Sequence, residues 1–232
     1  MKEFIIGLVS MLTVISCKAQ ENMKVVYVYD ALCGWCYGFS PAMNQFQEKY
    51  KSSLDVEVIS GGMVTGERVG PIGEVAGYIS WAYKDVEQAT GIKFGKGFLD
   101  GILKDGTAIF TSVPSAIALS VFKELQPSNS LAFAAALQKA VYFDGLEPKN
   151  YDGYGKIAAN FGLEAEEFVM KMNDDTYLKQ AEGDFSKSKA LGVTGFPTVF
   201  IEVNDTYYKI ASGYIPFEKL EKNFLSVKQQ MK

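Results

Sequence analysis

The chain has 232 residues, of which 48% are hydrophobic and 22% are charged. This composition is typical of a globular protein with a hydrophobic core, and it excludes a collagen-like or disordered chain. The formal net charge is −4 and the basic residues are scattered, so we expect no nucleic-acid partner. The sequence contains no histidine, which excludes a Ser-His-Asp triad, a Cys-His dyad and every zinc site with imidazole ligands.

Residues 1–16, MKEFIIGLVSMLTVIS, are predicted to be a signal peptide. One lysine precedes an apolar run over residues 4–15, and this run is too short for a membrane-spanning helix, which needs about 20 residues. Two cleavage sites fit. The letters VISC resemble a bacterial lipoprotein lipobox, in which Cys17 would carry the lipid, and the letters CKA fit an ordinary signal peptidase. We favour the lipobox.

Both cleavage routes predict an exported protein in the bacterial periplasm or cell envelope. Its membrane contact would be limited to a lipid anchor at Cys17. Either route also removes Cys17 from the redox count, because the residue is either lipidated or cleaved away. Cys33 and Cys36 then remain as two thiols in an oxidising compartment, where disulfides persist.

The next part of the chain has the pattern of a β-α-β unit. Residues 24–32 and 54–59 are predicted strands, and a helix is expected from about Cys36. Pro41 should kink that helix or shorten its first part. The two strands should be parallel, with a right-handed crossover.

A helical block follows, and the Gly-rich region 64–106 before it is ambiguous. Ser112 is the expected N-cap of the first helix, which continues through Leu125. The remaining predicted elements are helices over 131–143, 151–161, 163–172 and 175–191, strands over 197–203 and 206–211, and a final helix over 216–231. The order is therefore β-α-β, a block of helices, and then β-β-α.

The Cys33-Gly34-Trp35-Cys36 motif lies between a predicted strand and a predicted helix. Two cysteines at this spacing can form a disulfide, and a helix start stabilises a thiolate at the first of them. A metal site would need two more ligands that the chain does not offer. A purely structural disulfide would close only a short loop and stabilise little. The pattern favours a redox-active dithiol.

At these residues the chain resembles a known family. The segments YDALCGWCYGFSP and GVTGFPT, with the helical block between them, resemble the DsbA-like branch of the thioredoxin-fold superfamily. The resemblance implies an α/β thioredoxin fold with a large inserted helical domain. The fold would comprise residues 23–63 and 191–232, and residues 64–190 would form the insertion.

The resemblance also implies roles for the site residues. Cys33 would form the mixed disulfide with substrate and Cys36 would resolve it. Gly34 and Trp35 would tune the dithiol, although Trp35 fits equally well as an apolar contact to substrate. The Phe196–Pro197 bond would be cis, and the backbone at residue 196 would pair with an extended substrate segment.

The sequence also departs from the pattern of the strongly oxidising members. Those carry Pro-His between the cysteines, and the histidine helps to stabilise the thiolate. With Gly34 and Trp35 in these positions, we expect a less oxidising couple. The buried acid that these proteins place six residues before the first cysteine is Tyr27 here. Asp30 is the nearest acid upstream and would either assist proton transfer or simply end the strand.

We therefore predict a thiol-disulfide oxidoreductase that acts on cysteines of exported proteins and is recycled by a redox partner. It would need no metal or organic cofactor, because the dithiol carries two electrons. Disulfide isomerase or reductase activity on the same fold is an alternative. A second alternative is a chaperone-like peptide-binding module. A third is an enzyme of the kappa glutathione transferase or chromene-carboxylate isomerase type, although these relatives typically lack an intact Cys-x-x-Cys.

Overall fold

The computed structural model describes residues 23–231. The predicted signal peptide over 1–16 and the predicted lipid attachment at Cys17 lie outside the described residues. No helix within the described part is both long enough and apolar enough to cross a membrane.

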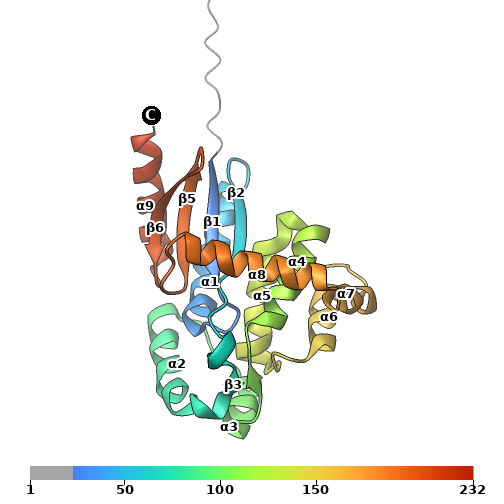
Figure 1. Cartoon of the computed structure of the whole chain (residues 1–232). Helices are drawn as coiled ribbons and strands as arrows, with labels where there is room; N and C mark the ends of the chain where they lie inside the picture. The colour runs from blue at the N-terminus through green and yellow to red at the C-terminus, as the bar shows by residue number, and fades with distance from the viewer. Residues whose placement is uncertain (1–22, 232) are drawn as a thin grey trace, which may run out of the picture.

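A four-stranded mixed sheet forms the base of the fold, in the order β2-β1-β5-β6 (Figure 1). The strands are β1 (Met23–Tyr29), β2 (Asp55–Ser60), β5 (Thr198–Val203) and β6 (Thr206–Ser212). Strands β1 and β2 are parallel, whereas β5 pairs antiparallel with both β1 and β6. The sheet thus joins the β-α-β unit at one end of the chain to the β-β-α unit at the other, as the sequence predicts.

Helices cover both faces of this sheet. Helix α1 (Gly34–Tyr50) and helix α9 (Phe217–Gln230) pack on the face to which Val25 and Tyr27 point, and Phe39 and Phe224 lie in the same core. Val26 and its alternate neighbours on β1 face the opposite side. Helix α8 (Asp175–Ala190) runs across that side of the sheet (Figure 1). The period-two alternation of β1 therefore fills two separate layers of the core.

The chain between β2 and β5 supplies the inserted helices of an α/β thioredoxin fold. Besides α8, they are α2 (Ala76–Thr90), α3 (Leu103–Asp105), α4 (Val113–Leu125), α5 (Ser130–Lys139), α6 (Tyr151–Ala159) and α7 (Ala165–Met172). Two π-helical segments, Gly97–Ile102 and Ala140–Asp144, and three short 3-10 turns, Gly66–Arg68, Ile72–Glu74 and Pro127–Asn129, connect them. The two-residue strands β3 (Gly70–Pro71) and β4 (Ile109–Phe110) pair with each other. A stack of Phe122 on Phe133, with centroids 4.0 Å apart, holds α4 to α5.

Two local expectations hold only in part. Helix α1 is continuous from Gly34 to Tyr50, so Pro41 does not shorten it. The carbonyl of Tyr37, which a proline four residues later leaves without its N–H donor, accepts the hydroxyl of Ser40 at 2.8 Å instead. Ser112 is the N-cap residue of α4, as expected, but its side chain makes no capping hydrogen bond. Its hydroxyl is used by a buried carboxylate in the site described below.

Candidate active site

Cys33 is the N-cap residue of α1, which places its sulfur at the positive end of the helix. The backbone N–H of Cys36 donates to the Cys33 sulfur at 3.3 Å. Cys33 is 6% exposed and Cys36 is 0% exposed, and both are free thiols. A helix N-terminus with a free N–H is an environment that stabilises a thiolate, so the geometry suits Cys33 as the attacking sulfur.

Cys36 lies deeper, in the core between α1 and the sheet. Burial raises the pKa of the Cys36 thiol well above its usual value, and the adjacent Cys33 raises it further. Cys36 therefore stays protonated at neutral pH until its surroundings change. The arrangement separates one thiol at a helix end from one enclosed thiol.

The second predicted motif lies directly beside Cys33. The Cys33 sulfur is 3.5 Å from the carbonyl oxygen of Phe196, and the Phe196–Pro197 bond is cis. The Phe196 ring occupies the space above Gly61, where any Cβ atom would overlap it. The Phe196 ring therefore fits here because residue 61 is a glycine. The position of the ring in turn fixes the position of the Phe196 carbonyl.

A buried carboxylate anchors the segment that leads into Cys33. Asp30 is 2% exposed and accepts the backbone N–H of Leu32 at 2.9 Å, the N–H of Met63 at 2.7 Å and the hydroxyl of Ser112 at 2.9 Å. Its own carbonyl accepts the Cys33 N–H at 3.1 Å. Burial raises the pKa of the Asp30 carboxyl, although the hydrogen bonds from Met63, Leu32 and Ser112 lower it. These bonds place Asp30 as an anchor between the first strand and the inserted helices.

The two residues between the cysteines have different surroundings. Trp35 is half-buried, and its ring lies 6.2 Å from that of Tyr214 at an interplanar angle of 30°. Gly34 is near Phe94, at an ordinary van der Waals separation for an added Cβ, so its small size is not required by packing. Trp35 also borders the pocket beside Cys33, so both of its predicted roles fit its position.

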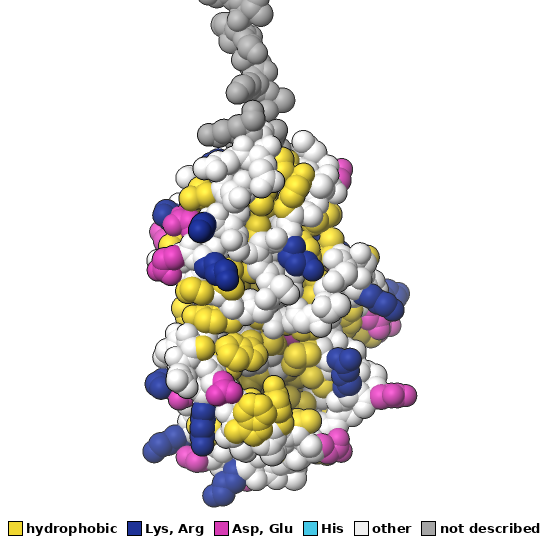
Figure 2. Space-filling view, turned by 90° about the vertical axis from the view of Figure 1, so that its left-hand side faces the viewer, with side chains coloured by type: hydrophobic (Ala, Val, Ile, Leu, Met, Phe, Trp, Pro, Cys, Tyr) yellow, Lys and Arg dark blue, Asp and Glu magenta, His cyan; other side chains and the backbone are white. Residues whose placement is uncertain are grey.

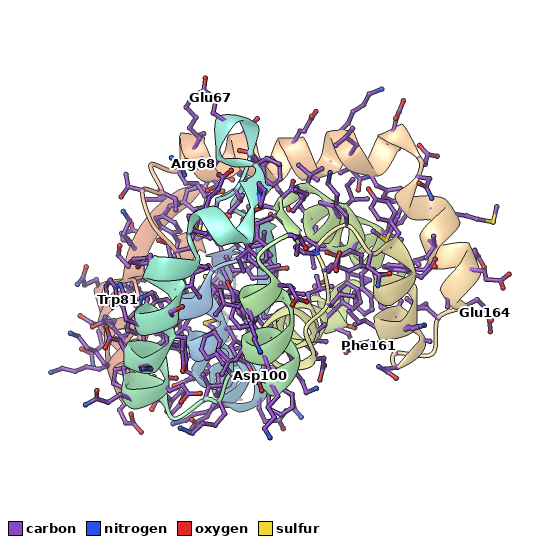
Figure 3. All side chains as sticks on the ribbon, turned by 90° about the horizontal axis from the view of Figure 1, so that it is seen from below. Glu67, Arg68, Trp81, Asp100, Phe161 and Glu164 are labelled. Atoms are coloured by element: carbon purple, nitrogen blue, oxygen red, sulfur yellow. The ribbon has the colours of Figure 1, made fainter. Side chains whose placement is uncertain are left out.

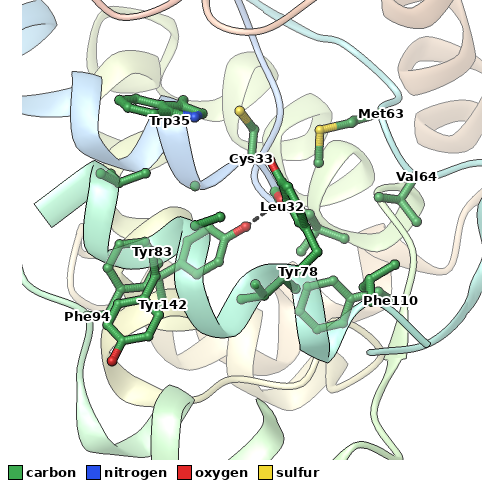
Figure 4. A pocket seen from close by; sticks show the side chains of 15 residues that line it. Leu32, Cys33, Trp35, Met63, Val64, Tyr78, Tyr83, Phe94, Phe110 and Tyr142 are labelled. Carbon is green, nitrogen blue, oxygen red and sulfur yellow. Dashed lines mark hydrogen bonds between the residues drawn. The ribbon is translucent and has the colours of Figure 1, made fainter. Parts of the chain in front are cut away.

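A pocket of about 280 Å³ opens next to Cys33, between the start of α1 and helix α2. Cys33, Trp35 and Met63 lie at one end, and the rings of Tyr83 and Tyr142 lie at the other (Figure 4). None of the residues that line it is charged. The remaining lining residues are Leu32, Gly34, Val64, Val75, Tyr78, Ile79, Ala82, Val86, Phe94 and Phe110.

The pocket continues into an apolar surface. Hydrophobic side chains gather on the lower half of the face that carries α2, with charged side chains around them (Figure 2). Tyr78 and Trp81 of α2 are 58% and 56% exposed, and Trp81 lies on the outer side of this helix (Figure 3). Arg68, the single arginine of the chain, lies on the segment before α2 and donates to the Met63 carbonyl at 3.1 Å.

The structure thus brings Cys33, Cys36 and Phe196 together, and it adds residues that sequence reasoning missed. The hydroxyl of Tyr142 donates to the carbonyl of Leu32, the residue before Cys33. Tyr142 comes from the helical region between β2 and β5. In the sequence it is only a tyrosine within a predicted helix, and that pattern does not indicate a contact with Leu32. Within residues 23–231 no cluster of His, Cys, Asp or Glu is arranged to hold a metal ion.

Comparisons with known proteins identify related proteins and related folds. The model of the DSBA-like thioredoxin domain matches residues 110–224. No curated protein sequence matches the chain. The fold is similar to that of a Nitrosomonas europaea protein provisionally assigned as a protein disulfide isomerase. The two are 25% identical with a TM-score of 0.81, over 91% of this chain and all of that one.

Two further structures are informative. The cytosolic disulfide reductase DsbM from Pseudomonas aeruginosa is 28% identical, with a TM-score of 0.76 over 90% of this chain and all of that one, and it is also known with GSH. A 2-hydroxychromene-2-carboxylate isomerase has a TM-score of 0.58 over 90% of this chain and 96% of that one. At 13% identity, that likeness shows the fold alone.

The chain therefore belongs to the DsbA-like family of thioredoxin-fold proteins, and it is a thiol-disulfide oxidoreductase.

Proposed function

We propose that this protein is an exported thiol-disulfide oxidoreductase that exchanges disulfides with cysteines of other exported proteins. The observation that carries the proposal is the position of the Cys33 sulfur. It lies at the N-cap of α1, accepts the Cys36 N–H and lies 3.5 Å from the Phe196 carbonyl. We infer from this position that the Phe196 backbone pairs with a substrate segment whose cysteine reaches Cys33.

The proposed exchange needs two displacement steps. The Cys33 thiolate attacks one sulfur of a substrate disulfide, the substrate S–S bond breaks, and a mixed disulfide with Cys33 forms. Cys36 then attacks the Cys33 sulfur, the mixed disulfide breaks, and the second substrate thiol leaves. Two electrons have moved to the substrate, and Cys33 and Cys36 are joined as a disulfide. The reverse sequence oxidises a substrate dithiol.

The lining of the pocket beside Cys33 supports a proposal for the class of substrate. Its lining is apolar and uncharged, which matches an aliphatic or aromatic side chain next to the substrate cysteine. The lining of the pocket offers no cation to the two carboxylates of glutathione. We therefore propose protein or peptide substrates with an apolar residue beside the cysteine. The wall formed by α2 belongs to residues 64–190, which we propose as the inserted domain.

We further propose that the net direction is reduction or isomerisation. The Gly34-Trp35 dipeptide contains no histidine to stabilise the reduced form. A cytosolic disulfide reductase is among the similar structures. Export and lipid attachment rest on the sequence of the first residues alone. Fatty-acid labelling of the full chain in bacteria should modify the parent and not Cys17→Ser, and labelling of neither would contradict a lipid anchor.

The function is tested with a disulfide-bonded peptide that carries an aromatic residue beside one cysteine. The full chain, with Cys17→Ser to leave two thiols, should reduce this peptide when dithiothreitol recycles it. Cys33→Ser should abolish turnover. Cys36→Ser should accumulate a mixed disulfide, detected by mass spectrometry. A chaperone-like module would instead bind the peptide equally well with and without Cys33 and exchange nothing, which would reject the proposal.

A further inference from the structure

The hydroxyl of Tyr27 is a buried donor without a partner. Its side chain is 1% exposed on β1, and its oxygen has no hydrogen-bond partner among the described residues. Tyr142 and Tyr154 are equally enclosed, but their hydroxyls donate to the carbonyls of Leu32 and Pro148. A buried polar group with no partner is costly, and in a native structure it calls for an explanation.

After burial, the two thiols are the groups that change the pKa of this hydroxyl most. The Tyr27 ring packs against Tyr29 and Phe39, with centroids 5.7 and 6.0 Å away. Burial raises the pKa of the Tyr27 hydroxyl well above its usual value, and Cys36 and then Cys33 raise it further. The phenol therefore keeps its proton at neutral pH, and Tyr27 and Cys36 are enclosed in the same core.

Cys36 needs a donor when it becomes a thiolate. Its sulfur is fully buried, and its own backbone N–H is committed to the Cys33 sulfur. The titratable groups that act on it are Cys33, Asp30, Tyr27, Tyr29 and Tyr142. The Cys33 thiol raises the pKa of Cys36, whereas Asp30 acts in both directions, because its backbone hydrogen bond lowers that pKa and its charge raises it. Of the three tyrosines, Tyr27 is the one whose buried hydroxyl has no hydrogen-bond partner among the described residues.

We propose that Tyr27 donates a hydrogen bond to the Cys36 thiolate as that thiolate resolves the mixed disulfide. This inference rests on the proposed function. While Cys36 is a thiol, the Tyr27 hydroxyl makes no hydrogen bond to any described residue, and a thiol is a weak acceptor. A thiolate is charged and accepts more strongly. The Tyr27 hydroxyl is thus a donor whose proposed acceptor, the Cys36 thiolate, exists only during the reaction.

The step balances without another reagent. Cys36 loses its proton and attacks the Cys33 sulfur, the Cys33–substrate S–S bond breaks, and a Cys33–Cys36 bond forms. The proton from Cys36 ends on the released substrate thiol. Tyr27 keeps its own proton throughout and contributes only the hydrogen bond.

The two displacement steps can be followed separately with the chromogenic disulfide 5,5′-dithiobis(2-nitrobenzoate). In the reduced Cys17→Ser chain, attack by Cys33 releases one coloured thiolate and resolution by Cys36 releases a second. Cys36→Ser should show the first release only, which assigns the phases. Tyr27→Phe should leave the first phase unchanged and slow the second about tenfold at pH 7, as expected for one lost hydrogen bond to a charged group. The pH midpoint of the second phase should rise.

Tyr154→Phe is the matched control, because it removes a buried tyrosine hydroxyl that already donates to the carbonyl of Pro148. It should change neither phase. If Tyr27 were merely structural, Tyr27→Phe would lower the thermal unfolding midpoint and slow both phases alike, whereas we expect an unchanged or higher midpoint. A second phase identical to that of the parent would overturn the inference. A parent chain that releases no colour would instead reject the proposed function.

Discussion

The sulfur of Cys33 lies 3.5 Å from the carbonyl oxygen of Phe196, a residue 163 positions further along the chain. The two residues come from opposite ends of the described chain and meet because β1 and β5 are neighbours in the sheet. Cys33 follows β1 after a short turn, and Phe196 lies two residues before the start of β5. The helices between β2 and β5 separate the two residues in sequence without disturbing this contact. One of these helices, α2, forms a wall of the pocket.

The position of Phe196 should depend on the lack of a side chain at residue 61. Gly61→Ala places a methyl group inside the Phe196 ring, so the ring and its backbone must shift. We expect a loss of about 1–3 kcal/mol in the free energy of unfolding, typical of overpacking, and slower disulfide exchange. Urea unfolding and peptide reduction measure these effects. Gly183→Ala, on α8 with open space around the site, should be neutral or slightly stabilising. Equal behaviour of the two variants would contradict the packing argument.

Filling the pocket should affect apolar substrates selectively. Ala82 lines the pocket, whereas Ala89 lies on the same helix, is exposed and does not line it. Ala82→Phe should lower kcat/KM for the peptide with an aromatic residue about tenfold, since one apolar side chain loses its site. A small disulfide such as oxidised glutathione should react almost as before. Ala89→Phe controls for the added ring, and a matching loss in that variant would rule out the pocket as the substrate site.

Asp30 should make stability depend on pH in a defined direction. Its pKa in the folded protein is raised above the usual value of 3.8, so the folded state binds this proton more tightly than the unfolded state. Its contribution to stability is therefore fully present below about pH 3.8 and is lost as the pH rises through the raised pKa. The stability difference between parent and Asp30→Asn should shrink over this range, by no more than about 1.4 kcal/mol per pH unit.

Urea unfolding of both proteins at several pH values measures this difference. Asp85→Asn, at an exposed site on α2, is the control and should show a difference that does not change with pH. If the stability of the parent relative to Asp30→Asn instead grew as the pH rises, the hydrogen bonds to Asp30 would outweigh its burial.

The residue between the cysteines should set the reduction potential. Trp35→His introduces an imidazole beside the Cys33 sulfur, which stabilises the thiolate and thus the reduced form. We expect the potential to rise by about 30 mV, a tenfold change in the equilibrium constant measured against glutathione. The other tryptophan, Trp81, lies exposed on α2, and Trp81→His should leave the potential unchanged. A parent potential near −120 mV, the value of DsbA, would contradict the prediction of a less oxidising couple.

The amino-acid sequence by itself determined the class of this protein. The Cys33–Cys36 spacing between a strand and a helix, the absence of histidine and the order of β-α-β and β-β-α units are local features, and local patterns predict elements and chemistry. Ser112 and Pro41 show the limit of such reasoning. Capping preference predicts a helix start at Ser112, but a buried carboxylate 82 positions away takes its hydroxyl. A neighbouring serine hydroxyl likewise occupies the carbonyl that Pro41 leaves free.

Only the tertiary structure decided which residues surround the dithiol. The cation-free pocket combines the start of α1 with α2, and residues 64–106 have no clear periodicity from which α2 could be placed against α1. The hydroxyl of Tyr27 is an ordinary part of a strand in the sequence, and its lack of a partner exists only once the sheet and α1 enclose it. Burial and hydrogen-bond satisfaction are properties of the packed molecule, and they separate the attacking thiol at the helix end from the enclosed thiol behind it.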